Sequence, residues 1–283
     1  MVPGMALLAV VIGGALLWNV QVSFTRWAGY DNPVWAGLHN YRFLLINPDF
    51  RTSVLHGLWF TVPFAILPTA LGLLVATVIY EYLMPRFGSA PGTLVRSALY
   101  LPQVVPVSIT GLLWVAILDD GGLVNMVLAA VGHSDVQRAW LTEPRSAQVW
   151  LSLIVFWLQL GYTTTIFIAG NARIDTRLYE AAELDGAGVL QRFRAVTLPQ
   201  LRPEVFVVLL TTVIGALKIF APVYWITGGG PIGATSVPSL YAFNAIYGGD
   251  QVPFGAAVAS VFTGIVGVLA WLMVRAHHAA DES

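Results

Sequence analysis

Six long apolar runs, separated by short polar segments, set the pattern of this chain. Each run has about the 20 residues that an α-helix needs to cross the hydrocarbon of a bilayer. The runs cover approximately Val2–Phe24, Leu55–Tyr80, Ala98–Leu118, Val149–Ala169, Val205–Ile226 and Phe254–Val274. Prolines inside the runs are compatible with membrane spans where neighbouring helices or water satisfy the carbonyls that they free. The pattern predicts an all-α, polytopic membrane helix bundle of six spans, which forms a single domain over residues 1–283.

The polar segment 171–203, between the fourth and fifth runs, has the composition of a helical hairpin. Asp175 is placed to cap a helix, because its carboxylate accepts backbone N–H bonds and suits the positive end of the helix dipole. The residues of Thr176–Asp185 favour a helix. Gly186 supplies the left-handed residue that ends such a helix without strain.

A second short helix is expected from near Gly188 to about Thr197, because Pro199 cannot continue it. The segment then forms two short helices at an angle, with small residues at the bend. Alanines at the bend let the backbone of a partner approach closely. Glu180 and Asp185 offer acceptors to its arginines or amides.

The sequence of this hairpin, EAAELDGAGVLQRFRAVTLP, resembles the coupling loop of ABC-importer permeases. The residues that match are Glu180, Ala181, Ala182, Asp185, Gly186, Ala187, Phe193 and Pro199. The resemblance implies that the loop rests in a cleft of an ATPase subunit in the cytoplasm, with the first six of these residues coupling the spans to ATP hydrolysis. It also implies three kinds of partner: a second homologous permease subunit, two ATPase subunits and an extracytoplasmic substrate-binding protein.

Other segments resemble the carbohydrate-uptake branch of these permeases, of the maltose, glycerol-3-phosphate and trehalose type. They are the sequence WAGLHNYRFLLINPDF of Trp35–Phe50, the sequence LPQVVP of Leu101–Pro106, and the sequence GGGP of Gly228–Pro231. The first of these is also expected to lie as a helix in the membrane interface, in contact with lipid. The resemblance implies a sugar or related polar solute as cargo, with neutral sugars, disaccharides and glycerol phosphodiesters all open.

Composition agrees with a membrane protein and removes several other functions. Charged residues make up 10% of the chain, against about 25% in soluble domains. The net charge of −1 gives no argument for nucleic acid. The only lysine, Lys218, lies between Leu217 and Ile219, so no phosphate-binding loop is present and ATP and Mg²⁺ are left to the partner ATPase. Without a cysteine, an HExxH pattern or a readable catalytic triad, we expect no metal, no cofactor and no enzyme activity in this chain.

Three residues are candidates for the wall of the substrate path: Lys218, Tyr224 and Gln159. Lys218 lies about eight residues from the end of its predicted span, or roughly 12 Å at 1.5 Å per residue. A charge at that depth usually faces protein or water, since it costs roughly 2.5 to 3.5 kcal/mol on insertion scales. The path is one interpretation, and a lysine that snorkels to the headgroups or pairs within the bundle is the other.

The arginines give the orientation. Eight lie on the side of the hairpin and five on the opposite side, and the positive-inside rule therefore puts the hairpin in the cytoplasm. With six spans, both termini are expected in the cytoplasm of a prokaryotic cell, with the chain in its plasma (inner) membrane. The alternative function is an ion-coupled secondary transporter of a polar solute. Such a transporter should carry carboxylates or paired charges within its spans, and the runs contain almost none.

Overall fold

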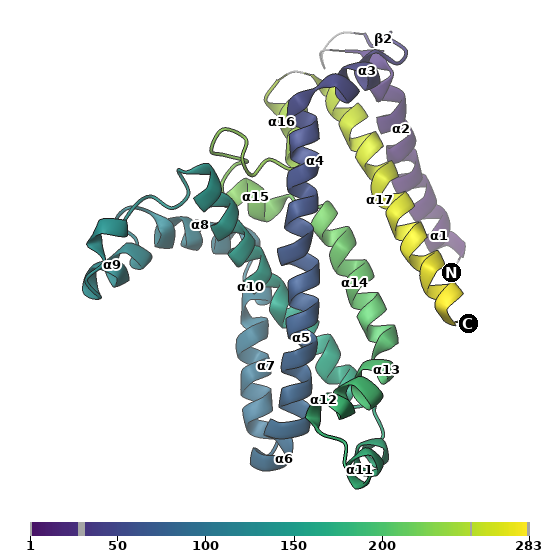
Figure 1. Ribbon diagram of the computed structural model, residues 1–283. Helices are drawn as coiled ribbons and strands as arrows, with labels where there is room; N and C mark the ends of the chain where they lie inside the picture. Colours follow the sequence, from purple (N-terminus) through teal and green to yellow (C-terminus); the bar gives the residue numbers. More distant parts are fainter. Residues whose placement is uncertain (1, 28–31, 250, 282–283) are drawn as a thin grey trace.

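The computed structural model describes residues 2–27, 32–249 and 251–281, and these are folded almost entirely into helices. Five helical stretches are long and apolar enough to cross a membrane, and a pair of helices bent by 70° makes up to six. The predicted all-α membrane bundle is therefore confirmed, and Figure 1 shows its elongated shape. Two short antiparallel strands, β1 (Thr25–Arg26) and β2 (Val34–Trp35), lie at the end opposite to the hairpin. We call these the far end and the hairpin end.

The described chain runs along the bundle six times, with short helices attached to the longer ones. The helices in order are α1 (Val2–Leu8), α2 (Gly14–Ser23), α3 (His39–Ile46), α4 (Pro48–Thr61), α5 (Leu67–Val78), α6 (Met84–Phe87), α7 (Ser89–Val104), α8 (Val107–Leu118), α9 (Leu123–Ala130), α10 (Pro144–Asn171), α11 (Thr176–Leu184), α12 (Val189–Arg192), α13 (Leu198–Gln200), α14 (Arg202–Leu217), α15 (Ala221–Ile226), α16 (Pro238–Tyr247) and α17 (Val252–Asp281).

The second pass, made of α4, α5 and α6, is one continuous helix of 40 residues. It contains π-helical turns at Val62–Ile66 and Ile79–Leu83, and a proline follows two residues after each, Pro68 and Pro85. A proline removes the hydrogen bond to the carbonyl four residues back, and its ring crowds that carbonyl. Here that carbonyl lies within the wider π turn, where the next bond reaches five residues back instead. The helix therefore continues past Pro68 and Pro85.

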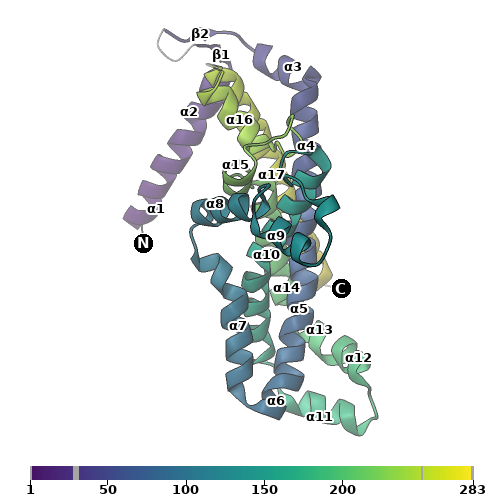
Figure 2. The ribbon, with the colours of Figure 1, turned by 90° about the vertical axis from the view of Figure 1, so that its left-hand side faces the viewer.

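α10 occupies the middle of the bundle and contributes to the two largest core clusters. Figure 2 shows it beside α5 and α7. Glycines make this packing close. A Cβ added to Gly161 of α10 would stand 2.0 Å from the carbonyl oxygen of Leu99, and one added to Gly72 of α5 would stand 2.4 Å from Oγ1 of Thr163. α10 therefore packs directly on the backbone of α7, and the backbone of α5 packs on the Thr163 side chain of α10.

The first and last helices lie side by side at the far end. Asn19 of α2 donates from Nδ2 to Oγ of Ser260 at 2.9 Å and to the carbonyl of Ala256 at 3.2 Å, both on α17. α1 and α17 both point their free ends toward the hairpin end (Figure 1). The N-terminal end of α1 and the C-terminal end of α17 are therefore directed toward the same end of the bundle as the hairpin.

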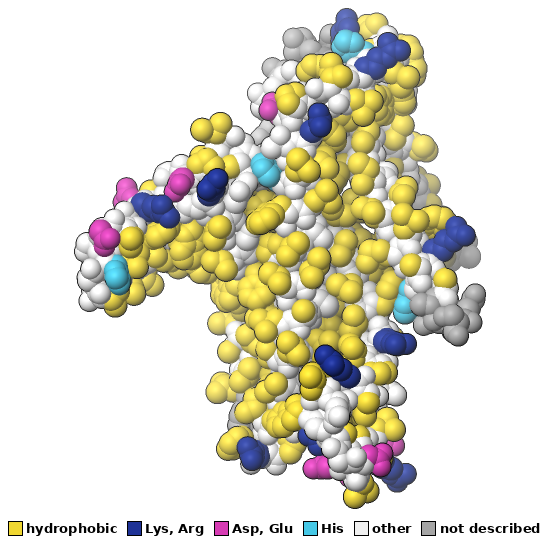
Figure 3. Space-filling view, in the orientation of Figure 1, with side chains coloured by type: hydrophobic (Ala, Val, Ile, Leu, Met, Phe, Trp, Pro, Cys, Tyr) yellow, Lys and Arg dark blue, Asp and Glu magenta, His cyan; other side chains and the backbone are white. Residues whose placement is uncertain are grey.

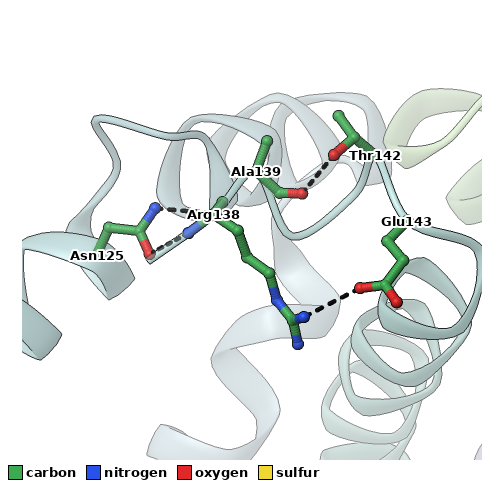
Figure 4. A network of polar contacts seen from close by, with 5 residues as sticks. All are labelled: Asn125, Arg138, Ala139, Thr142 and Glu143. Atoms are coloured by element: carbon green, nitrogen blue, oxygen red, sulfur yellow. Dashed lines mark hydrogen bonds and ion pairs between the residues drawn. The ribbon is translucent and has the colours of Figure 1, made fainter. Parts of the chain in front are cut away.

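The segment between α8 and α10 is organised by one buried amide. Asn125 is 2% exposed, and its Nδ2 donates to three backbone carbonyls, one of them that of Arg138 at 2.9 Å. Its Oδ1 accepts from Nε1 of Trp140 at 2.9 Å. Figure 4 shows the same segment closed by an ion pair of 3.0 Å between Arg138 and Glu143. An amide is suited to this place because it donates and accepts at once.

Apolar side chains cover much of the middle of the bundle, while charged side chains gather toward the two ends and along the α9 arm (Figure 3). Large residues stay exposed on the outer helices, among them Leu7 at 67%, Leu17 at 73% and Leu55 at 64%. Hydrocarbon tails or another membrane subunit would cover such a surface, because soluble proteins rarely expose so large an apolar patch to water.

Candidate functional site

Two of the predicted spans are interrupted, and both interruptions have the same cause. The run 98–118 is divided between α7 and α8, because Val105 and Pro106 are extended, with ψ of 129° and 133°. A residue before a proline is pushed out of the helical region. Pro106 also has no N–H to offer the carbonyl of Pro102, which is thereby left without its helical donor.

The run 205–226 is likewise divided between α14, which ends at Leu217, and α15, which begins at Ala221. Phe220 between them has φ −136° and ψ −62°. Pro222 has no N–H for the carbonyl of Lys218, four residues back. Lys218 is the C-cap of α14 and therefore lies at a helix break. The sequence had suggested that it lies within a continuous span.

The two breaks face each other across a cleft of about 580 Å³ beside α10. Its lining residues come from the π-helical turn Val62–Ile66 of the second pass, from both breaks with the adjoining helix ends, and from α10: Phe64, Pro102, Gln103, Val104, Val105, Pro106, Val107, Leu158, Gln159, Lys218, Ile219, Phe220, Ala221 and Pro222. The polar side chains are two amides and one ammonium group, and this lining contains no carboxylate. Within the described residues Lys218 is exposed and forms no ion pair.

Two of the three predicted path residues meet in this cleft. Gln159 and Lys218 both line it, and Gln103, which the sequence analysis missed, joins them. Gln103 donates from Nε2 to Oε1 of Gln159 at 3.0 Å and to the carbonyl of Leu158. The only sequence signal for Gln103 is its place between Pro102 and Pro106, where a helix break exposes side chains.

Tyr224, the third predicted residue, lies outside the cleft lining and belongs to an aromatic cluster next to it. Its ring is 5.3 Å from that of Phe220, 5.3 Å from that of Trp225 and 5.4 Å from that of Phe243. Phe220 lines the cleft itself. Tyr224 therefore contacts the cleft only indirectly, by stacking on the ring of Phe220.

The hairpin begins as the sequence predicts. Asp175 caps α11 by accepting the N–H of Arg177 at 3.0 Å. Gly186 has φ 75°, the left-handed conformation expected at the end of that helix. Of the six residues matched to the coupling loop, Glu180, Ala181, Asp185 and Gly186 are exposed, and Ala182 and Ala187 are half-buried.

The second hairpin helix is longer than predicted. A π-helical turn, Phe193–Thr197, follows α12, and the helix continues through Pro199 to Gln200. The expected end at Thr197 is therefore wrong by three residues. The π turn again contains the carbonyl that Pro199 would crowd, so the proline does not stop the helix.

The exposed side of the hairpin carries apolar residues that nothing in the described chain covers. Leu184 is 90% exposed, Leu190 is 59% exposed and Val189 is 56% exposed. On the opposite side Tyr179, Ala182 and Phe193 pack on the core of the bundle, where burial raises the pKa of the Tyr179 hydroxyl above its usual value. The hairpin is thus held on one side and offers an apolar surface on the other.

Comparison with known proteins gives the chain a family context. The family model for binding-protein-dependent transport system inner membrane components matches residues 86–279. The trehalose/maltose transport system permease protein MalF of Thermococcus litoralis is 37% identical over 216 residues, which are 76% of this chain and 70% of that protein. The probable ABC transporter permease protein YurN of Bacillus subtilis is 30% identical over 245 residues, which are 86% of this chain and 82% of that protein.

A solved structure agrees in fold. A chain of a bacterial alginate ABC transporter, crystallised in complex with an alginate pentasaccharide-bound periplasmic protein, superposes with a TM-score of 0.81 at 20% sequence identity. The match covers 96% of this chain and 91% of that chain. At this identity the likeness supports the arrangement of helices.

Proposed function

Because this chain belongs to the family of binding-protein-dependent transport system inner membrane components, the permease subunits of ABC importers, we propose that it forms one half of an import path for a sugar or oligosaccharide. The single observation that carries the location of the path is the cleft between the two helix breaks. Non-helical backbone at membrane depth is tolerated only where protein buries it or where it lines a water-filled cavity. Two such breaks on one cleft therefore mark the hydrated route.

The chemistry of the cleft fits a polar cargo with many hydroxyl groups. Gln103 and Gln159 offer amide donors and acceptors, and Lys218 offers an ammonium donor. Apolar and aromatic residues such as Phe220 supply surface for the C–H faces of a sugar ring. A cation as cargo or coupling ion is disfavoured, because the described lining has an ammonium group and no carboxylate. The ion-coupled transporter therefore has no observation in its favour.

Members of this family act with a binding protein, and we propose the remaining partners as well. The hairpin 171–203 would lie in the cytoplasm and rest on one of two ATPase subunits, which hold ATP and Mg²⁺, and a homologous permease would form the other half of the path. Leu184 and its apolar neighbours on the exposed hairpin surface support such docking. Glu180, Asp185 and the small residues beside them would then contact the ATPase. Both termini would also be cytoplasmic, since the free ends of α1 and α17 are directed toward the hairpin end.

Transport then requires that ATP binding favours one of two states of the complex, since a ligand shifts an equilibrium only by its difference in affinity for the two states. The side chains of the cleft would face the cytoplasm in one state and the binding protein in the other. The hairpin is the part of this chain that would detect the state of the ATPases.

The test is uptake of a panel of labelled glycosides by the complete complex in proteoliposomes. We expect uptake that requires both ATP and the binding protein. Lys218→Ala should then impair uptake at unchanged complex assembly, and Lys218→Arg should not restore it, because a planar guanidinium does not replace a compact ammonium in a shaped site. Arg275→Ala is the matched control, since Arg275 stacks on Trp271 near the end of α17. Normal kinetics for Lys218→Ala would assign the lysine to the lipid interface.

A further inference from the structure

At the hairpin end, the second pass contacts the hairpin through a chain of hydrogen bonds. Thr197 of the hairpin is fully buried and donates from Oγ1 to Oε1 of Glu81 at 3.0 Å. The hydroxyl of Tyr179 lies 3.0 Å from the same Oγ1. Since the Thr197 proton is given to Glu81, Tyr179 is the donor of the second bond. Both helices of the hairpin are therefore attached to one carboxylate of the second pass.

π-helical turns place both partners of this contact. Glu81 lies in the turn Ile79–Leu83 of the second pass, and Thr197 lies in the turn Phe193–Thr197 of the hairpin. A π turn inserts an extra residue into the helix and is frequent at functional sites. A neighbouring bond runs from Nη2 of Arg192 to the hydroxyl of Tyr82 at 3.4 Å. The attachment is thus built from the two π-helical turns that accommodate Pro85 and Pro199.

The opposite half of the same helix contacts the loop between α15 and α16. Nδ1 of His56 lies 3.1 Å from the carbonyl oxygen of Ser236 and donates to it. Gln148 of α10 donates from Nε2 to the carbonyl of Ala234 at 2.7 Å, and this nitrogen lies 3.3 Å from Nε2 of His56. The second pass and α10 therefore hold the loop together.

This loop, residues 227–236, is itself closely bonded. Thr235 is fully buried and donates to the carbonyl of Gly230 at 2.8 Å, and its Oγ1 lies 2.7 Å from Oγ1 of Thr227. At the tip Ile232 is 99% exposed and has φ 50°, a conformation that a β-branched residue rarely adopts. A loop bonded in this way moves as a unit with the helices that hold it.

We infer that the second pass and α10 form one transmission unit, which carries movement of the hairpin to the loop 227–236, with Glu81 and His56 as its two positioning residues. The inference rests on the proposed function. The two residues are about 25 positions apart on one helix, or roughly 38 Å at 1.5 Å per residue. α10 is covalently continuous with the hairpin, which follows it in the chain. The Glu81 contact prevents the second pass from sliding against the hairpin. The close approach of Gly72 to Thr163 locks the two helices together between these ends.

α14 is the other helix joined to the hairpin, and it does not provide this route. It ends at Leu217, at the break beside the cleft, and the chain beyond Phe220 changes direction into α15. A displacement along α14 would therefore be absorbed at the break. The second pass has no such interruption between Glu81 and His56.

A double-mutant cycle on the reconstituted complete transporter tests the inference, with solute transported per ATP hydrolysed as the readout. Glu81→Met removes the acceptor for Thr197, and His56→Phe removes the bond to Ser236. Each should lower the ratio about threefold to tenfold, the effect of losing one hydrogen bond, and Glu81→Gln should restore it because an amide oxygen still accepts. Sites this far apart normally add. We expect the double variant to have the same ratio as the single variant with the lower ratio, because both substitutions interrupt one route.

The control pair is Glu81→Met with Glu143→Gln, which removes a carboxylate bonded only to Arg138 in the described structure. The two substitutions of this control pair should act independently, so the double variant should lower the ratio of solute transported per ATP hydrolysed by the product of the two single factors. Multiplying effects for Glu81→Met with His56→Phe would overturn the inference. Absence of ATP-driven uptake by the wild-type complex would instead refute the proposed function, so the two failures are distinguishable.

A cross-link gives a second measurement, in which a covalent link replaces the hydrogen bond between Thr197 and Glu81. The chain has no cysteine, so Glu81→Cys with Thr197→Cys gives one pair for a short bifunctional thiol reagent. The reference is the same double-cysteine variant before cross-linking, which lacks the bond and should have a lowered ratio of solute transported per ATP hydrolysed. Because the hairpin and the second pass move together in the transmission unit, we expect cross-linking to maintain or raise that ratio. Uptake that stops on cross-linking and returns when a cleavable linker is cut would overturn the inference.

Discussion

Gln103 and Gln159 are hydrogen-bonded to each other in the lining of the cleft, with Nε2 of Gln103 3.0 Å from Oε1 of Gln159. The first comes from the interrupted third pass and the second from the central helix α10. Because Oε1 of Gln159 is occupied by this bond, its amide nitrogen is left to donate to a cargo. The pair therefore fixes the orientation of one polar group in the proposed path.

Replacing Gln103 with leucine should weaken the interaction with the cargo. Gln103→Leu removes the bond that orients Gln159, and a net hydrogen bond is worth about 0.5–1.5 kcal/mol, or roughly two- to tenfold. We expect KM for uptake to rise by that factor, with little change in ATP hydrolysis without cargo. Gln21→Leu, at an exposed position on α2, is the control. An unchanged KM would remove Gln103 from the path.

Gly186→Ala should reduce the coupling of ATP hydrolysis to uptake. Gly186 has φ 75°, and an added Cβ meets no atom within 4 Å, so the cost of about 1–2 kcal/mol comes from the backbone alone. The bend between the hairpin helices should shift while the spans still insert. Gly188→Ala is the matched control, because Gly188 has φ −70°. Equal uptake per ATP in the two variants would contradict the role of the bend.

Gly161→Ala should destabilise the bundle. Its Cβ would stand 2.0 Å from the backbone oxygen of Leu99, which cannot move as a side-chain tip can. Overpacking of this kind costs about 1–3 kcal/mol. Thermal unfolding of the purified complex should show a lower midpoint, whereas Gly264→Ala, with no atom within 4 Å of its Cβ, should leave it in place. Equal midpoints would show that α7 and α10 separate easily.

The orientation can be tested with single cysteines in this cysteine-free chain. Arg177→Cys on the hairpin should react with an impermeant thiol reagent only after the cytoplasmic side is opened. Asp135→Cys, in the exposed segment between α9 and α10, should react in intact cells. Labelling of both positions in intact cells would contradict the six-pass topology.

What the sequence predicted well was local. The cap by Asp175 and the left-handed Gly186 depend on neighbours within a few residues, and the structure has both. Long apolar runs likewise predicted the membrane bundle, because the bilayer demands them. Pro199 misled the prediction, since a π turn accommodates it without ending the helix.

The cleft and the transmission unit depend on contacts between distant segments, for which one sequence carries no local signal. Thr197 and Glu81 are 116 positions apart, and His56 and Ser236 are 180 apart. The sequence analysis took the prolines as compatible with continuous spans, and it predicted neither the two helix breaks nor the cleft that they line. Its charge made Lys218 a candidate for the path, with a snorkelling or paired lysine as the alternative, and the structure shows it at a helix break that lines the cleft.

The assignment of the cleft to the import path can be tested by the accessibility of the cleft in two nucleotide states. Gln159→Cys, on an otherwise cysteine-free chain, is placed in the complete complex in proteoliposomes and exposed to an impermeant thiol reagent on one side at a time. Without nucleotide we predict labelling from the ATPase side only. With ATP bound to a hydrolysis-defective ATPase and the binding protein present, we predict labelling from the binding-protein side only. Labelling that is the same in both states would contradict the assignment of this cleft to the import path.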